Sequence, residues 1–316
     1  MAGSRYLSPK SLALALGVSE SSVKRWADDG LIEASRTAGG HRRIARNDAL
    51  AYIRARGLTL ADPGAIGLDV LETVRGSPDN ETLKLAVLEG WEEQARGILI
   101  ARYLNGESIA ALCDGPIAES LREVGELWEH GDEGIYREHR ATEICLQALT
   151  VLRTLLPRCD PGAPVAIGCA PPGDPYRIPS LMASLVLAAA GWNERNLGAD
   201  LPLRALLAAM DQYRPRLVWL SFFSDAAARR FPLEDDRLSE RAAALDSVIV
   251  VGGRTCPRAL AGGNGPFHCI GSMTALDAFA RALKLRPAAA TPGTHAPSPP
   301  AGAAGTDPDH PSRGPA

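Results

Sequence analysis

The chain has 316 residues, of which 46% are hydrophobic and 22% are charged, and its formal net charge is -3. This length is enough for two or three domains with substantial cores. The N-terminus lacks the apolar region of a secretory leader, and no stretch approaches the roughly twenty apolar residues of a membrane span, so we expect a cytoplasmic protein.

The charge is divided unevenly along the chain. Residues 1–58 carry ten Lys and Arg against five Asp and Glu, a net charge of +5, which leaves -8 for the remainder. A basic N-terminal region joined to an acidic remainder indicates a nucleic-acid contact near the N-terminus. The six cysteines show no C-x-x-C spacing, which argues against a zinc knot or a disulfide framework and favours reduced, mostly buried thiols.

Residues 1–58 begin with a helix, a tight turn and a second helix. Ser8 is a suitable N-cap for an apolar helical segment that ends at Gly17. After this turn Ser19 caps a second helix over residues 20–29, on which Val23 and Trp26 would face the core. The opposite face of that helix carries short hydroxyls and cations, which suit the major groove of DNA and its phosphates.

A basic hairpin follows over residues 31–44, centred on Gly39-Gly40, and a further helix is expected at residues 47–56. The residues that we expect to contact DNA are Ser21, Ser22, Lys24, Arg25, Arg36, His41, Arg42 and Arg43. The alternative is a solvated helix face beside a basic loop. The sequence R-x-x-G-G-H-R-R-I over residues 36–44 resembles the wing of the MerR group of regulators. This resemblance implies a winged helix-turn-helix that binds a double-stranded DNA operator as a homo-oligomer, either a dimer or a tetramer.

The middle of the chain predicts a four-helix bundle. After a linker at residues 59–65, apolar residues recur at three and four spacing in four stretches, at residues 66–75, 81–104, 108–129 and 134–156. Short polar breaks between the later stretches make neighbouring helices antiparallel. The bundle is therefore expected over residues 66–157.

The pattern changes at residues 163–286, where short apolar runs alternate with helices. Strands are expected at residues 165–169, 192–197, 217–222, 248–251 and 269–271. Helices are expected at residues 180–190, 203–213, 239–245 and 275–285, with a weak turn at 257–261. This alternation predicts an α/β doubly wound parallel sheet of the Rossmann-like kind, whose ligands bind beyond the carboxyl ends of the strands. Residues 287–316 are rich in Pro, Ala and Gly and are expected to be a disordered tail.

Four residues at the expected carboxyl ends of these strands match a fingerprint of cobalamin-binding domains, D-x-H-x-x-G followed by S-x-L and then by G-G. The matching residues are Asp174, Ser221, Gly252 and Gly253. In that family the histidine ligates cobalt from below, and the aspartate holds the histidine in the correct tautomer. Here Tyr176 stands at the histidine position, Pro179 at the glycine position and Phe223 at the leucine position. A tyrosine would bind a metal only as phenolate, so we assign no confident metal ligand.

A second motif lies in the expected bundle, where Trp128 is followed after nine residues by Glu138-His139. The bundle, the sheet and the MerR-like head together resemble the cobalamin-dependent photoreceptor repressors of the CarH and LitR type. In that group this motif covers the upper face of the corrin and its adenosyl group, so the resemblance implies adenosylcobalamin as cofactor. Asn196 and Gly198 resemble the loop that follows the second strand in that family. The same Trp-Glu-His arrangement is open to another interpretation, a core tryptophan beside a surface ion pair.

The resulting hypothesis is a DNA-binding transcriptional regulator, in the first place a repressor and not an enzyme, with a cobalamin-type and light-responsive sensory half. Three states of that half remain open because of Tyr176. It binds cobalamin with no protein ligand below cobalt, it binds another flat ligand, or it binds none and serves oligomerisation or a protein partner. A corrinoid-carrying module of the methyltransferase type is a further alternative, against which the DNA-binding head argues.

Overall fold

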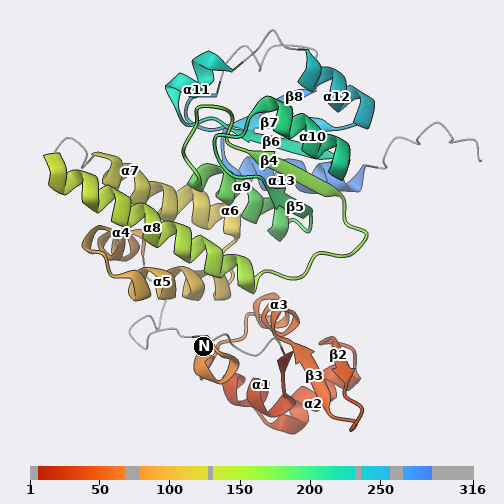
Figure 1. Cartoon of the computed structure of the whole chain (residues 1–316). Coiled ribbons are helices and arrows are strands. Elements are labelled where there is room, and N and C mark those ends of the chain that lie inside the picture. The colour runs from red at the N-terminus through yellow and green to blue at the C-terminus, as the bar shows by residue number, and fades with distance from the viewer. Residues whose placement is uncertain (1–5, 69–78, 127–130, 232–235, 257–265, 287–316) are drawn as a thin grey trace, which may run out of the picture. The chain divides into compact units, whose positions relative to one another are not determined.

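The computed structural model of the chain is shown in Figure 1. It describes residues 6–68, 79–126, 131–231, 236–256 and 266–286. The tail expected at residues 287–316 and the weak turn expected at 257–261 lie outside these ranges. No helix within the described ranges is both long enough and apolar enough to cross a lipid bilayer.

The N-terminal domain is a helix-turn-helix with a three-stranded antiparallel sheet. In chain order its elements are β1 (Tyr6–Leu7), α1 (Pro9–Leu16), α2 (Glu20–Asp28), β2 (Ala34–Arg36), β3 (Arg42–Ala45) and α3 (Arg46–Arg56). The sheet order is β1-β3-β2, so the hairpin that we expected gains a third, short strand from the N-terminus. Ser8 caps α1 as expected, because its Oγ accepts a hydrogen bond from the N–H of Ser11 at 3.0 Å.

The core of this domain forms where the three helices meet the sheet. Leu12, Val23, Ile44 and Leu50 have no solvent exposure, which confirms the core orientation expected for Val23. Trp26 is only partly buried, and its ring centroid lies 5.4 Å from that of Tyr52 on α3. These contacts fix α2 with one face inward, so that its other face is presented to solvent.

The segment expected to be an irregular linker has structure of its own. Pro63–Ile66 forms a short 3-10 helix, η1, whose first turn is capped by Asp62 through a hydrogen bond from the N–H of Ala65. Ile66 is buried, and the N–H groups of Ala61 and Asp62 both donate to the carbonyl of Ala15 on α1. The segment therefore packs on the helix-turn-helix domain.

The middle of the chain is helical, as expected, but its helices begin and end elsewhere. They are α4 (Asn80–Glu89), α5 (Glu92–Leu104), α6 (Ile109–Leu112), the π-helical turn η3 (Cys113–Ile117), α7 (Ala118–Glu126) and α8 (Gly131–Leu155). The single helix expected at residues 81–104 is wrong, because Gly90 ends α4 in the left-handed conformation with φ +81°. Most of the stretch expected at residues 66–75 lies outside the described residues.

The C-terminal half is a parallel sheet with helices on both faces, which confirms the predicted fold class. Its strands are β4 (Val165–Cys169), β5 (Asn193–Asn196), β6 (Leu217–Ser221), β7 (Val248–Gly252) and β8 (Phe267–Ile270). Its helices are α9 (Ile178–Ala189), α10 (Leu203–Tyr213), α11 (Asp225–Arg230), α12 (Arg237–Leu245) and α13 (Met273–Leu285). The strand order β5-β4-β6-β7-β8 reverses direction beside β4, as a doubly wound sheet requires. Among the elements described in this half, the short helix α11 alone has no counterpart among the expected elements.

Side chains of successive residues on each strand point to opposite faces of this sheet. On β6, Trp219 packs on the side of α9 and α13, whereas Val218 and Leu220 pack on the side of α10 and α12. A Cβ atom at Gly168 would lie 2.1 Å from the indole of Trp219, so glycine on β4 leaves the space that this side chain fills. The indole N–H donates to Ser180 Oγ at 3.0 Å, which satisfies its polar group inside the core.

Polar contacts join the bundle to the sheet. Asp114 in η3 accepts hydrogen bonds from the N–H groups of Met273 and Thr274, the first residues of α13, at 2.7 and 2.8 Å. Arg153 on α8 donates to both carboxylate oxygens of Glu194 on β5 at 3.0 Å. Because a carboxylate stabilises the amino end of a helix, the bundle supplies part of the capping that α13 needs.

Candidate functional site

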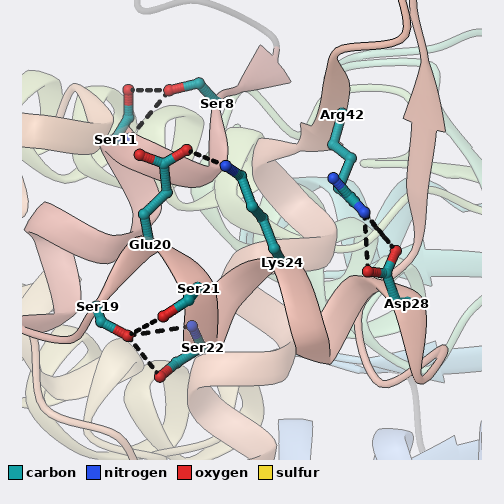
Figure 2. A network of polar contacts seen from close by, with 9 residues as sticks. All are labelled: Ser8, Ser11, Ser19, Glu20, Ser21, Ser22, Lys24, Asp28 and Arg42. Atoms are coloured by element: carbon teal, nitrogen blue, oxygen red, sulfur yellow. Dashed lines mark hydrogen bonds and ion pairs between the residues drawn. The ribbon is translucent and has the colours of Figure 1, made fainter.

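The exposed face of α2 carries hydroxyls and cations. Ser19 caps the helix by accepting a hydrogen bond from the N–H of Ser22 at 3.2 Å, and its Oγ lies 2.8 Å from Ser21 Oγ and 2.9 Å from Ser22 Oγ (Figure 2). Lys24 forms an exposed ion pair with Glu20 at 2.8 Å, and a hydrogen bond from Lys24 holds the pKa of Glu20 below its usual value. Arg25 is exposed beside them. Because Val23 is buried on the other face of α2, these polar side chains point toward solvent.

The wing formed by β2 and β3 is attached to the end of α2. Arg42 donates to both carboxylate oxygens of Asp28, with its shortest contacts at 2.8 Å (Figure 2). A nitrogen of Arg36, which pairs with Arg42 across the hairpin, lies 3.7 Å from the same carboxylate. The Arg42 side chain is 22% exposed, so its guanidinium is engaged within the protein. Bidentate pairing of this kind fixes orientation as well as distance.

The other wing cations are exposed. The guanidinium of Arg43 lies 4.3 Å from the ring centroid of Tyr6 on β1, and His41 lies in the exposed turn. Gly40 in that turn has φ +78°, and its N–H donates to the carbonyl of Thr37 at 2.9 Å. The structure therefore brings the eight expected DNA-contacting residues onto α2 and the adjacent hairpin. Sequence reasoning missed Asp28, because an acidic residue at a helix end gives no sign of a partner fourteen residues later.

The expected cofactor motif of the bundle is described only in part. Trp128 lies outside the described residues, whereas Glu138 and His139 lie near the amino end of α8. Glu138 accepts a hydrogen bond from Thr142 Oγ1 at 3.0 Å and is half-buried. His139 is 73% exposed in its side chain, with Nε2 3.7 Å from Glu138 Oε2. Tyr136 is also exposed, so this end of α8 presents an aromatic ring and an imidazole to solvent.

Asp174 joins two loops at the carboxyl edge of the sheet. Its side chain has no solvent exposure. Oδ2 accepts hydrogen bonds from the N–H groups of Phe223 and Ser224, which follow β6, at 2.6 and 2.9 Å. Oδ1 accepts a hydrogen bond from the N–H of Tyr176 at 3.1 Å. The carboxylate therefore serves as an acceptor for three backbone donors and ties the loop after β4 to the loop after β6.

Tyr176 forms one end of an aromatic group at this edge. Its ring centroid lies 5.3 Å from that of Phe223 at an interplanar angle of 63°, and the residue is 46% exposed. The guanidinium of Arg254 lies 4.8 Å from the centroid of the Phe223 ring. Phe223 thus has an aromatic edge contact and a cation contact, both of favourable geometry. Arg254 gave no signal in the sequence, because it belongs to no recognised spacing.

The glycines and small residues of the fingerprint lie at the ends of β6 and β7. Ser221 ends β6 and is 7% exposed, and Gly252 ends β7. Gly253 has φ +107°, and a Cβ atom there would lie 2.0 Å from the carbonyl oxygen of Phe222. Only glycine fits this position, because both its conformation and its close approach exclude a side chain.

The loop after β5 is organised around Asn196. Its Oδ1 accepts hydrogen bonds from the N–H of Gly198 at 3.0 Å and from Ser180 Oγ at 3.1 Å. Gly198 has φ +93°, which this turn requires. The structure thus brings Asn196 and Gly198 together, with Ser180 and Trp219 in the same chain of hydrogen bonds.

Among the described residues of the sheet edge, Tyr176 stands at the position expected for a cobalt ligand. Both oxygens of Asp174 are engaged by backbone donors, so its acceptor capacity is largely used, and the phenol at position 176 offers no imidazole nitrogen. His268 lies on β8, where its ring centroid is 4.9 Å from that of Phe279 on α13. Within the described ranges no group of three or more His, Cys, Asp or Glu side chains surrounds a metal position. The residues present here do not fit coordination of cobalt from below.

Known proteins resemble this chain in both of its functional parts. Residues 6–57 match the helix-turn-helix domain family, and residues 80–153 match the B12 binding domain family. The HTH-type transcriptional repressor CarA of Myxococcus xanthus is 29% identical over 257 residues, which cover 77% of this chain and 85% of that protein.

A solved structure supports the fold of the bundle and the sheet. The monomethylamine corrinoid protein of Methanosarcina barkeri superimposes with a TM-score of 0.51 at 14% identity, covering 64% of this chain and 96% of that chain. At this identity the likeness shows a shared fold alone. The two family matches and the similarity to CarA together indicate a transcriptional regulator with an N-terminal helix-turn-helix domain and a B12 binding domain.

Proposed function

We propose that this protein represses transcription by binding a double-stranded DNA operator through α2 and the wing, and that it is a regulator and not an enzyme. The observation that carries the proposal is the bidentate contact between Arg42 and Asp28, which fixes the basic hairpin beside the exposed face of α2. A recognition helix and a wing held in one orientation form a surface suited to one groove and its flanking phosphates.

The residues of this surface take different roles. Ser21, Ser22, Lys24 and Arg25 contact base edges and phosphates from α2, and Arg36, His41 and Arg43 contact phosphates from the wing. Arg42 acts mainly by positioning the wing, because its guanidinium is engaged by Asp28. The protein binds as a homo-oligomer, a dimer or a tetramer, so that two copies of the surface reach two half-sites of the operator.

The experiment begins with selection of DNA from a random-sequence library by the full-length protein. Affinity for the selected DNA is then measured by fluorescence anisotropy at several salt concentrations. Arg25→Ala and Arg43→Ala are each expected to reduce the slope of log affinity against log salt by about one. Arg241→Ala, which removes an exposed cation on α12 of the sheet domain, is the matched control and should leave the slope unchanged. Failure to enrich any sequence, or equal slopes for all variants, contradicts the proposal.

For the sensory half, we infer that adenosylcobalamin is held without a protein ligand below cobalt. Glu138, His139 and Trp128, which lies outside the described residues, would hold its upper face, and Asn196, Gly198, Ser221, Gly252 and Gly253 would hold its nucleotide tail. The match of residues 80–153 to the B12 binding domain family and the exposed imidazole of His139 support this arrangement. Asp174 and Tyr176 shape the edge of the site and do not coordinate the metal.

Absorption spectra test this inference directly. The purified protein is mixed with adenosylcobalamin in the dark, desalted, and measured before and after exposure to green light. A retained spectrum in which the cofactor's own base remains on cobalt supports the inference, and a change on illumination extends it to light sensing. Tyr176→His is the companion variant, in which an added imidazole is expected to change the spectrum of bound cobalamin. A colourless protein after desalting contradicts cobalamin binding.

A second candidate is a cobalamin-independent regulator whose C-terminal half serves oligomerisation or binds a protein partner. The contact between Tyr176 and Phe223 favours it, because aromatic side chains occupy the edge where a cobalt ligand is expected. The two candidates differ in a simple way. A protein that is colourless after desalting but still oligomeric by light scattering supports the second, whereas a coloured protein supports the first.

A further inference from the structure

Two cysteines lie in sulfur-to-sulfur contact at the edge of the sheet. Cys256 follows β7, and Cys269 lies on the edge strand β8, where it pairs with Val251. Their Sγ atoms are 3.7 Å apart. Cys256 is partly buried against the face covered by α10 and α12, and Cys269 is exposed. One thiol is therefore exposed to solvent, while the other is partly buried beside it.

The remaining cysteines are in different surroundings. Cys113, Cys145 and Cys169 are buried, and burial raises the pKa of each thiol. Cys159 is partly exposed, and its thiol donates a hydrogen bond to the carbonyl of Asp160. Reagents in solution are therefore expected to reach Cys269 and Cys159 most easily. Cys159 provides a natural control for exposure without a neighbouring sulfur.

The surroundings of the pair favour a disulfide over a metal site. A structural zinc ion needs four ligands, and within the described residues no third His, Cys, Asp or Glu joins these two thiols in a metal-binding group. A disulfide needs only the two sulfur atoms, which must approach to about 2.0 Å. Because the sulfur atoms are already in contact, small rotations of the two side chains supply most of the remaining movement.

We propose that Cys256 and Cys269 form a modification site that reacts with low-molecular-weight disulfides of the glutathione type and closes to an internal disulfide. The site lies in the sheet domain and does not depend on DNA binding by the N-terminal domain.

The reaction is a pair of thiol–disulfide exchanges. Cys269 loses its proton and attacks one sulfur of the small disulfide, whose S–S bond breaks to release one small thiol that takes up a proton. Cys256 then loses its proton and attacks the sulfur of Cys269, so that the mixed disulfide breaks and releases the second small thiol. Two protein thiols are oxidised and one small disulfide is reduced to two thiols, which balances the electrons.

The order of attack follows from exposure and charge. Burial, the hydrogen bond with Cys269 and the nearby charge of Cys269 raise the pKa of Cys256 to about 12, so this thiol is rarely ionised in the reduced protein. Exposed Cys269 therefore reacts first with a reagent from solution. Contact with the mixed disulfide then allows Cys256 to act as the resolving thiol, because the high local concentration offsets its low ionisation.

Oxidation would fasten the loop after β7 to the edge strand. The N–H of Thr255 in this loop donates to the carbonyl of Phe222 at 3.2 Å, and Arg254 lies over Phe223. The disulfide therefore restrains a loop that contacts the residues following β6. Its effect is local to the carboxyl edge of the sheet.

The test uses the full-length protein equilibrated with mixtures of oxidised and reduced glutathione, then quenched with acid, alkylated with N-ethylmaleimide and mapped by peptide mass spectrometry. Wild type and Cys159→Ser are each expected to lose two alkylatable thiols at the pair and to give a peptide linked between residues 256 and 269. Cys256→Ser should stop at a glutathione adduct on Cys269. Cys269→Ser should keep residue 256 free of glutathione.

Two results would overturn the proposal, and both are read in wild type without relying on the folding of a variant. The first is a glutathione adduct on Cys269 at equilibrium with no linked peptide. The second is a linked peptide that joins other cysteines in preference to this pair. Circular dichroism of each variant checks that the serine substitutions leave the fold intact.

Discussion

Asp174→Ala tests whether this carboxylate holds the carboxyl edge of the sheet together. The substitution removes three hydrogen bonds to a charged acceptor with no solvent exposure, from the N–H groups of Phe223, Ser224 and Tyr176. Bonds to charged groups contribute about 1.5–3 kcal/mol each, and partly accessible donors favour the low end of that range. We therefore expect the free energy of unfolding to fall by about 4.5 kcal/mol.

Urea titration followed by tryptophan fluorescence measures this loss, because Trp219 is buried on β6 and Trp192 is buried directly before β5. Asp211→Ala is the matched control, since it removes a carboxylate of the same domain that forms an exposed ion pair with Arg241. That variant should cost less than about 1 kcal/mol. Equal, small losses in both variants would refute the structural role assigned to Asp174.

Three further substitutions have defined outcomes. Gly253→Ala should lower the free energy of unfolding by about 3 kcal/mol or more, because the new Cβ would lie 2.0 Å from a carbonyl oxygen at a residue with φ +107°. Gly271→Ala is the control and should cost far less, since a Cβ there meets nothing within 4 Å. Equal shifts of the melting temperature in the two variants would contradict this prediction. Asp114→Ala should cost about 1–2 kcal/mol in urea titration by uncapping α13, and an unchanged midpoint would show that water replaces the cap. Asp28→Ala should weaken operator affinity by about tenfold in fluorescence anisotropy, because the wing is no longer held beside α2. The slope of log affinity against log salt should stay the same. Unchanged affinity would show that Arg42 does not position the wing.

The sheet could be predicted closely from the sequence, whereas the bundle could not be predicted in detail. Strands buried on both faces are continuous apolar runs, which is why the expected strand at residues 165–169 agrees with β4. Apolar periodicity continues across Gly90, and this pattern favoured one long helix over the stop that the glycine makes at the end of α4. Strand β1 was missed for a different reason, because its two residues pair with β3 nearly forty positions away.

The candidate site could be predicted in position but not in its contacts. The alternation of strands and helices placed Asp174 beyond the carboxyl end of a strand, where it lies. Its partners Phe223 and Ser224 are 49 and 50 residues further along the chain, and backbone donors leave no mark in the sequence. The same holds for Asp28 and Arg42, since each reads separately as a surface charge until the hairpin folds back on α2.

The matched residues of the fingerprint have structural duties that need no cofactor. Asp174 accepts hydrogen bonds from three backbone N–H groups. Glycine is the only residue type that fits at position 253, beside the carbonyl of Phe222. The histidine position of the fingerprint differs from these, because no contact within the fold requires an imidazole there. Tyr176 occupies this position and packs against the ring of Phe223. A chain can therefore keep the spacing of the fingerprint for reasons of folding without a histidine at position 176. It follows that the spacing is evidence for the architecture of this edge and not for a cobalt ligand.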